Sequence, residues 1–348
     1  MAINLHETSD CEVPSSFKDF ADCAMKDKTA GNAIGAASLL MNSCFLSYGM
    51  VQVGSFVSQT LLPGLNLDPT SMVAAYSILL GVAFCTQKND GIENIANAAV
   101  MVLFSSFAAL LLPSLVNVQS PMDTFVAEGT HPEHLASAIS ASIPLIVSTM
   151  IYQNIVPSVV KMLEFDRTKS TIAIALGSFV PMIMYMAWCF AVLGGGLDNS
   201  LASGAGGAMF AAFTASSFLG SSIGCVMSLA EEYESIITST SQEEDASCKL
   251  DGGFSVPAVV MSVLPPAAVA LTVSNGGDGA FTAPLHLSGA VIAPFLYGLL
   301  PIMLLQSIRS ETKGQNAAIN RIPQVLLGAS TVGLLGNEII HDCSNWFS

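Results

Sequence analysis

The residues most able to bind a polar ligand lie in one long apolar stretch, between two prolines. In chain order, the prolines and the side chains between them are Pro144, Thr149, Tyr152, Gln153, Asn154 and Pro157. A proline removes one backbone hydrogen bond of a helix and leaves a carbonyl group without its donor. In lipid such a break persists only where it faces protein or a water-filled cavity, and broken helices of this kind form substrate sites in transporters. We interpret this stretch as a substrate site, with a simple proline kink as the alternative.

The side chains of this stretch offer a phenol, amides and a hydroxyl to a bound solute. Tyr152 can stack on an aromatic ring, and the amides of Gln153 and Asn154 can bond the polar ends of the solute. Ser216 and Ser217, in a later apolar stretch, are expected to face them, with close helix packing as the alternative. Because neither a histidine nor a carboxylate base lies at a similar depth, these serines are not expected to be nucleophiles. The sequence predicts no enzyme and no catalytic residue.

The elements that position these residues are membrane-spanning helices. The chain is 52% hydrophobic and only 11% charged, whereas soluble domains carry about 25% charged residues. A helix needs roughly 20 apolar residues to cross the bilayer core. Nine stretches satisfy this length: 33–60, 69–86, 95–116, 137–160, 170–195, 206–230, 254–275, 284–306 and 322–341. The second is short and the seventh contains Pro265 and Pro266, so these two are the least regular.

The basic residues give an independent test of the nine spans, because Lys and Arg accumulate in cytoplasmic loops. All 11 of them lie before the first span or after an even-numbered one. They are Lys18, Lys26, Lys28, Lys88, Lys161, Arg167, Lys169, Lys249, Arg309, Lys313 and Arg321. The alternation predicts a cytoplasmic N-terminus, a C-terminus on the opposite side, and an integral multi-pass membrane protein.

The remaining charges indicate neither a nucleic-acid partner nor a metal centre. The net charge of −15 argues against nucleic acid and anionic headgroups as partners. No charged residue falls in the middle of a span, and the run of Glu231, Glu232 and Glu234 is interpreted as a solvated acidic loop. His131 and His134 have no third convergent ligand, so a solvated loop is favoured over a metal site. We expect no cofactor and no metal.

Several motifs resemble those of the tryptophan/tyrosine (aromatic amino acid) permeases, particularly their plant and algal branch. Residues 151–157 (IYQNIVP) resemble the motif VYQNVVP of that branch, and residues 216–220 (SSFLG) are similar to TSFLG. Residues 177–188 contain Gly-Ser, proline, tyrosine and tryptophan in the spacing of the family. Residues 265–301 carry its prolines, phenylalanine and glycines, and residues 89–94 (NDGIEN) are similar to a family loop. The motifs follow the family order over most of the chain.

The resemblance implies a leucine-transporter-like bundle of eleven helices, built from two inverted five-helix repeats and one extra helix. It implies secondary active uptake of aromatic amino acids, tryptophan or tyrosine, driven by protons. The span 137–160 would be the sixth helix of the family, and 33–60, with Phe45, Tyr48 and Gln52, would be the third. The domain divisions would be 1–32 (cytoplasmic), 33–341 (transporter), 33–116 (incomplete first repeat), 137–306 (second repeat) and 322–341 (extra helix).

One departure from the family leaves a second function open. Residues 1–30 resemble the segment before the third family helix, so the first two helices are expected to be missing. The first of these is the other broken helix, which normally provides half of the substrate site. The alternative is therefore a truncated, non-transporting membrane protein with a binding or regulatory role. A plasma membrane and a plastid envelope are both compatible with the sequence.

Overall fold

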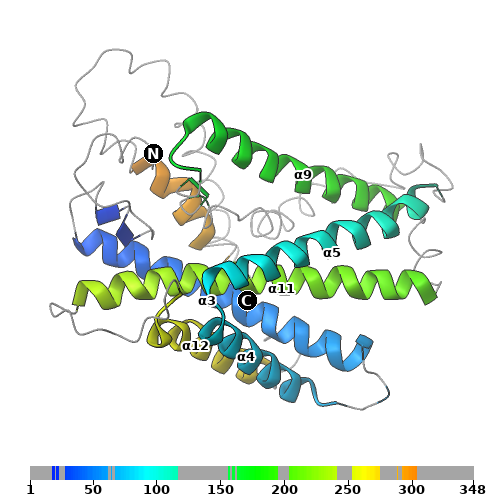
Figure 1. The fold of residues 1–348 in the computed structure, drawn as a ribbon, viewed down its shortest axis with the longest axis horizontal. Coiled ribbons are helices and arrows are strands. Elements are labelled where there is room, and N and C mark those ends of the chain that lie inside the picture. The colour runs from blue at the N-terminus through cyan, green and yellow to red at the C-terminus, as the bar shows by residue number, and fades with distance from the viewer. Residues whose placement is uncertain are drawn as a thin grey trace, which may run out of the picture.

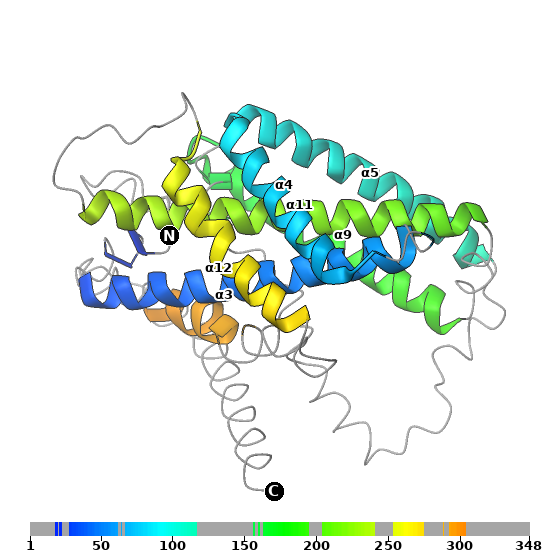
Figure 2. The same cartoon turned by 90° about the horizontal axis from the view of Figure 1, so that it is seen from below.

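The fold is a bundle of long helices (Figures 1 and 2). The computed structural model describes residues 18–19, 21–22, 28–61, 64, 67–116, 156, 159–160, 163–194, 204–240, 253–274, 288 and 292–303. Its elements are α3 (Lys28–Phe56), η1 (Val57–Leu61), α4 (Pro69–Thr86), α5 (Asn89–Val116), α9 (Arg167–Leu193), α11 (Gly204–Thr240), α12 (Val256–Ser274) and η5 (Pro294–Leu299). Each element in the described ranges is an α-helix or a short π-helical segment.

Six helices are long and apolar enough to cross a membrane. They coincide with the predicted spans 33–60, 69–86, 95–116, 170–195, 206–230 and 254–275. The prediction of an all-helical, polytopic membrane protein is therefore confirmed.

The structure describes only small parts of the other three predicted spans. Within 284–306 the structure describes a shorter apolar helix, Pro294–Met303. The span 322–341 and nearly all of 137–160 lie outside the described residues. The count of nine spans stays a prediction.

Both of the irregular spans are helical. α4 begins at Pro69 because the Asp68 carboxylate accepts hydrogen bonds from Ser71, at 3.1 Å from its backbone nitrogen and 3.2 Å from its hydroxyl. An aspartate cap followed by proline at the first helical position is a strong helix start. In α12, Pro265 and Pro266 lie inside a continuous helix.

Helix directions agree with the alternation of basic residues. In Figures 1 and 2, α3, α5, α9 and α12 run one way, and α4 and α11 run the other. The contacts of α3 with α11 confirm their antiparallel arrangement: Asn42 lies against Ser228, whereas Phe56, further along α3, packs on Phe218. The helix ends followed or preceded by Lys and Arg therefore lie at one end of the bundle, which we call the inner end.

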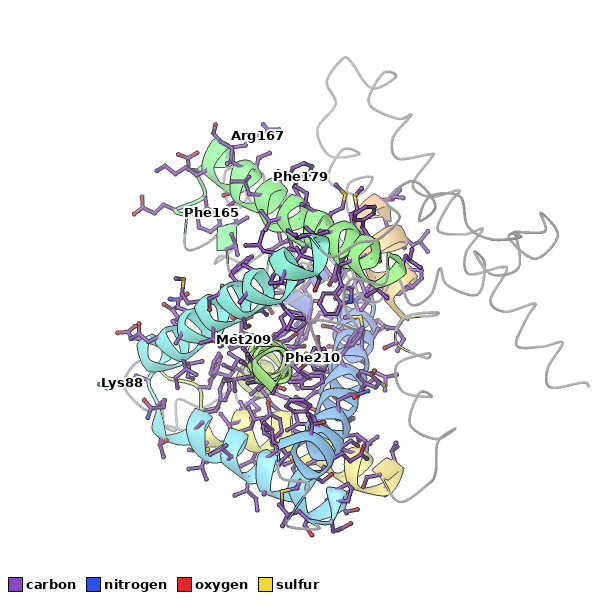
Figure 3. All side chains as sticks on the ribbon, turned by 90° about the vertical axis from the view of Figure 1, so that its right-hand side faces the viewer. Lys88, Phe165, Arg167, Phe179, Met209 and Phe210 are labelled. Carbon is purple, nitrogen blue, oxygen red and sulfur yellow. The ribbon has the colours of Figure 1, made fainter. Side chains whose placement is uncertain are left out.

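α11 occupies the centre of the bundle. It packs against α3, α5 and α12, and Figure 3, viewed along its axis, shows it between α5 and α3. Every seventh residue of α3 lies on its contact with α11: the small or polar residues Gly35, Asn42 and Gly49, and then Phe56. Spacing of seven is typical of helices that cross at a shallow angle, and small residues let their backbones approach closely.

The acidic run after the sixth span is helical, so its interpretation as a solvated loop is wrong for Glu231, Glu232 and Glu234. α11 continues to Thr240 because residues 231–240 contain neither glycine nor proline to end it. Glu232 is only 1% exposed. Glu234 accepts a hydrogen bond from the Ser255 backbone nitrogen at 2.8 Å, which ties α11 to the start of α12.

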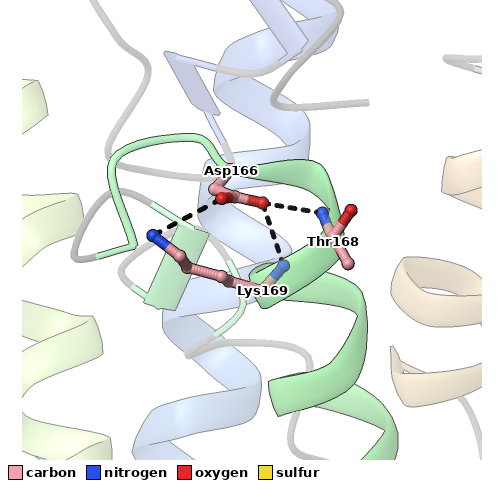
Figure 4. A network of polar contacts seen from close by, with 3 residues as sticks. All are labelled: Asp166, Thr168 and Lys169. Carbon is pink, nitrogen blue, oxygen red and sulfur yellow. Dashed lines mark hydrogen bonds and ion pairs between the residues drawn. The ribbon is translucent and has the colours of Figure 1, made fainter.

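The inner end of α9 is fixed by an aspartate cap (Figure 4). The carboxylate of Asp166 accepts hydrogen bonds from the backbone nitrogens of Thr168, at 2.9 Å, and Lys169, at 3.0 Å. The Lys169 ammonium lies 3.5 Å from the other carboxylate oxygen. The backbone hydrogen bond from Lys169, followed by that from Thr168 and the charge of Lys169, lowers the pKa of Asp166 below its ordinary value, against a smaller opposing effect of desolvation.

This cap gives a pH-dependent prediction. Because the pKa of Asp166 is lowered in the folded protein, its contribution to stability is present above about pH 4 and is lost as the pH falls through the folded-state value. Asp166→Ala is expected to speed amide exchange at Thr168 and Lys169 at neutral pH. Asp166→Asn also caps helices well, so these two amides should exchange more slowly in it than in Asp166→Ala. The difference in exchange rate between Asp166→Asn and the parent protein should vanish in acid. Identical exchange in all three proteins at neutral pH would contradict the role of the cap.

Candidate substrate site

Two of the six residues predicted to line the site lie in the described part of the chain. Thr149, Tyr152, Gln153 and Asn154 are outside the described residues. Ser216 and Ser217 lie on α11, the central helix. Their assignment to a substrate site stays a prediction, and the structure shows what surrounds these two serines.

Ser216 and Ser217 differ in their surroundings. Ser216 is 7% exposed, and its hydroxyl oxygen lies 2.8 Å from the Ala212 carbonyl and 3.0 Å from the Phe213 carbonyl of its own helix. Such a bond satisfies the hydroxyl locally, as is common for serines in helices. Ser217 is half-buried. Of the two, Ser217 is better placed to offer its hydroxyl to a ligand.

Ser217 shares a face of α11 with two glycines, Gly220 and Gly224, because residues three and seven positions apart lie on one side of a helix. A Cβ placed on either glycine would meet no atom of the described residues within 4 Å. Among the described residues, nothing covers these two glycines, and together with Ser217 they make this part of the face small.

A polar pair of α3 lies at the same depth. Gln52 donates a hydrogen bond from Nε2 to the Tyr48 hydroxyl oxygen at 2.8 Å, and both side chains are half-buried. Phe45, half-buried on the same face of α3, packs against the cluster formed with η5. The resemblance named these three residues on the first span, and the structure places them together.

Contacts between α3 and α11 show that Gln52 and Ser217 lie at a similar depth. Gly49 lies against the Ser222 hydroxyl of α11, and the Phe56 ring packs edge-on against Phe218 at 6.3 Å between centroids. Gln52 lies between Gly49 and Phe56 on α3, so it is level with the stretch of α11 that follows Ser217. The described half of the candidate site is thus a phenol, an amide and a hydroxyl on two adjacent helices.

Sequence reasoning missed a buried polar group deeper in the bundle. Asn42 is fully buried, and its Nδ2 lies 3.0 Å from the Ser38 carbonyl and 3.3 Å from the Ser228 hydroxyl oxygen of α11. An asparagine within an apolar span is a detectable signal, because a buried amide in lipid requires hydrogen-bond partners. The partner helix could not be inferred without the register of α3 against α11.

It also missed a charged group at the inner end. Lys18 is 5% exposed and Glu232 is 1% exposed, and both lie over Gly35 of α3. Lysine and glutamate are almost never fully buried unless they are paired. The available signal was the absence of glycine and proline from residues 231–240, which lets α11 continue as a helix and keep Glu232 packed against the bundle.

These groups are suited to binding a polar ligand. The described residues contain no group of three or more His, Cys, Asp or Glu that could hold a metal ion. The polar groups between α3 and α11 are amides, hydroxyls and a phenol, which donate and accept hydrogen bonds. Such groups inside a membrane bundle usually mark a path for a polar solute.

Long apolar helices around polar groups define a multi-pass membrane protein. The comparison with protein families identifies the family: the model of the tryptophan/tyrosine permease family matches residues 3–204, more than half of the chain. The chain therefore belongs to the tryptophan/tyrosine permease family, a family of amino acid transporters, as the motifs indicated. The comparisons with curated proteins and with solved structures gave no match.

Proposed function

We propose that this protein is a secondary active transporter of aromatic amino acids, tryptophan or tyrosine, coupled to protons. The family match over residues 3–204 is the observation that carries the proposal. The proposed architecture is the leucine-transporter-like one, with nine spans in this chain and inverted repeats at 33–116 and 137–306. The plant and algal branch is proposed from the motif in residues 151–157.

The described helices support a substrate site near the middle of the membrane. Tyr48 and Gln52 of α3 and Ser217 of α11 provide polar groups at one depth, beside the glycine face of α11. We propose that Thr149, Tyr152, Gln153 and Asn154 complete the site, with Ser216 beside Ser217. A tyrosine ring would stack on the substrate, while amides and hydroxyls would bind its ammonium and carboxylate.

Reconstitution into liposomes tests the proposal. The protein should take up labelled tryptophan or tyrosine, and unlabelled aromatic amino acids should compete while lysine and glutamate should not. Gln153→Ala should reduce the uptake rate by about ten- to a hundredfold, because one hydrogen bond to a charged group contributes about 1.5–3 kcal/mol. Gln87→Ala is the matched control, since Gln87 is an exposed glutamine at the end of α4. Equal uptake by the parent protein and Gln153→Ala would remove Gln153 from the site.

Ligand-induced stabilisation separates transport from a purely binding role. Tryptophan at about 100 times its dissociation constant should stabilise the folded protein by about 2.7 kcal/mol if a site forms. Stabilisation without uptake would favour the non-transporting alternative. Neither stabilisation nor uptake with any aromatic amino acid would overturn the proposed function.

A further inference from the structure

The inner end of α11 carries a carboxylate in an unusual position. α11 has 37 residues and is about 55 Å long, so it extends beyond the roughly 30 Å of bilayer hydrocarbon. Glu232 is about 12 Å from the Thr240 end of the helix. It is nevertheless 1% exposed, among the most buried large side chains of the described residues.

Groups from three other segments enclose Glu232. On the α3 side, a Cβ placed on Gly35 would lie 3.5 Å from the Glu232 carboxylate oxygen Oε2 and 3.1 Å from Cβ of Lys18. Lys18 and Asp19 precede α3, and Asp19 accepts a hydrogen bond from Ser235 of α11 at 2.7 Å. From the η5 side, the Tyr297 hydroxyl lies within electrostatic range of the carboxylate.

The described part of the chain places a small set of charged and titratable groups near Glu232. The segment before α3 contributes Lys18, Asp19 and Asp22, of which Asp22 lies against Gly31. η5 contributes Tyr297, and α11 itself contributes neighbouring acids and Cys225. Where α3 contacts α11 in this region, it presents Gly35 and Ser38. Among the residues that the structure describes, Lys18 is the basic side chain that packs with Glu232 over Gly35.

Glycine at position 35 is what permits this arrangement. A Cβ there would press on the Lys18 stem, and a side chain longer than a methyl group would also meet the carboxylate. The residues packed around this point, from the segment before α3, from α3 and from η5, are apolar and buried, including Ala21, Ile34 and Leu296. The carboxylate can exchange a proton with inner water only when this packing opens.

Polar groups connect this carboxylate to the middle of the bundle. One turn before Glu232 on α11 is Ser228, which lies 3.3 Å from the Asn42 amide nitrogen of α3. Ser38, one turn beyond Gly35, is fully buried beside Asn42. The α3–α11 contact thus has hydrogen-bonding groups between the candidate substrate site and Glu232.

We propose that the Glu232 carboxylate is the proton-binding site that couples amino acid movement to the proton gradient. The inference rests on the proposed transport function and adds its coupling group. The carboxylate takes a proton from water on the outer side of the membrane and gives it to water on the inner side, so that only an O–H bond forms and breaks. Lys18 packs beside the carboxylate over Gly35, and a nearby cation favours the ionised form of a carboxylate.

The test compares two assays in phosphatidylcholine–phosphatidylglycerol liposomes. The first measures tryptophan accumulation driven by an imposed pH gradient, acidic outside. The second measures exchange of labelled for unlabelled tryptophan without a gradient, which needs the substrate site but no net proton movement. Glu232→Gln should lose gradient-driven accumulation to the level of protein-free liposomes and retain exchange.

Glu234→Gln is the matched control, two residues away on the same helix. Glutamine keeps an oxygen that can accept the Ser255 backbone hydrogen bond, so both accumulation and exchange should be retained. Accumulation by Glu232→Gln at the parent level would overturn the inference. So would a parent protein that exchanges tryptophan but never accumulates it in a pH gradient.

A second variant decides the case in which Glu232→Gln loses both activities. Lys18→Gln removes the cation beside the carboxylate, which makes protonation easier, so accumulation should persist to an outer pH about one unit higher. An unchanged pH dependence would overturn the inference. If the parent protein shows no exchange, the transport function fails first, and that result is distinct from all of these.

Discussion

Gly54→Ala is expected to lower the free energy of unfolding by about 1–3 kcal/mol, because it overpacks the contact between α3 and α4. A Cβ on Gly54 would lie 2.6 Å from a Val73 methyl carbon and 2.8 Å from the Pro69 backbone carbonyl oxygen. Real Cβ contacts are longer, and the backbone of Pro69 cannot rotate away as a side chain would. The two helices must separate, although alanine itself favours a helix by about 1 kcal/mol.

The loss should grow with the size of the side chain. Gly54→Leu should prevent the normal packing of Val73, which is fully buried in the main core, and reduce the yield of folded protein. Unfolding in mixed micelles, followed by circular dichroism, measures the change for alanine. Gly81→Ala on α4 is the control, because a Cβ there meets no atom of the described part of the chain within 4 Å.

The changes in the free energy of unfolding caused by Gly54→Ala and Gly81→Ala are expected to differ in sign, and this difference tests the close contact. Gly81→Ala should leave stability unchanged or raise it by up to about 1 kcal/mol, since only the helix preference of alanine acts there. If both glycines tolerate alanine equally, the close approach of α3 and α4 at Gly54 is refuted.

Helix positions could be predicted from the sequence because lipid imposes a single rule. Every backbone polar group in the hydrocarbon must be satisfied internally, so an apolar stretch of sufficient length must form a helix. α4 begins at the predicted residue because Asp68 and Pro69 encode its start locally. α12 remains a helix despite Pro265 and Pro266, and the Ser47 hydroxyl of α3 lies 2.9 Å from the Pro266 carbonyl oxygen.

The end of α11 could not be predicted from hydrophobicity. Charged residues after an apolar stretch normally leave the membrane for water, and this reasoning led to a solvated loop. The helix instead continues, and Glu232 packs over Gly35 beside Lys18, which lies more than 200 positions away in the sequence. A carboxylate that is buried beside a residue so distant in the chain has no local signature.

Only part of the candidate site could be predicted from the sequence. The polar character of Ser216 and Ser217 is visible in the sequence, but which of them keeps an outward hydroxyl depends on the helix face. Ser216 bonds to its own helix, while Ser217 lies on the face of Gly220 and Gly224. The Tyr48–Gln52 hydrogen bond joins residues four apart on α3, so their spacing alone places them on one face.

Phe107→Ala is expected to weaken the attachment of α9 to the bundle. The Phe107 ring of α5 packs against Trp188 of α9, at 6.0 Å between centroids, and against Phe213 of α11, at 5.5 Å. Trp188 and Phe213 also stack, at 6.0 Å, so the three rings join three helices. Each aromatic pair contributes about 0.5–1.5 kcal/mol. Loss of the two pairs of Phe107 should therefore cost about 1–3 kcal/mol.

The effect is large for α9 because lipid removes the usual driving force for packing. Apolar side chains such as Ile172 and Leu176 are more than half exposed on this helix, and in a bilayer they are as stable against lipid as against protein. Ring packing is then a main source of association between α9 and its neighbours. Amide exchange along α9 in bicelles should become faster in Phe107→Ala, with little change in α4.

Phe179→Ala is the control on the same helix. Phe179 is 53% exposed and lies on the side of α9 turned away from α5 (Figure 3), so its removal should leave exchange and stability unchanged. Equal effects of the two substitutions would mean that lipid contact, and not the three rings, holds α9 in place. A selective effect of Phe107→Ala would show that the three rings attach α9 to α5 and α11, since contact of apolar side chains with lipid does not favour one helix position over another.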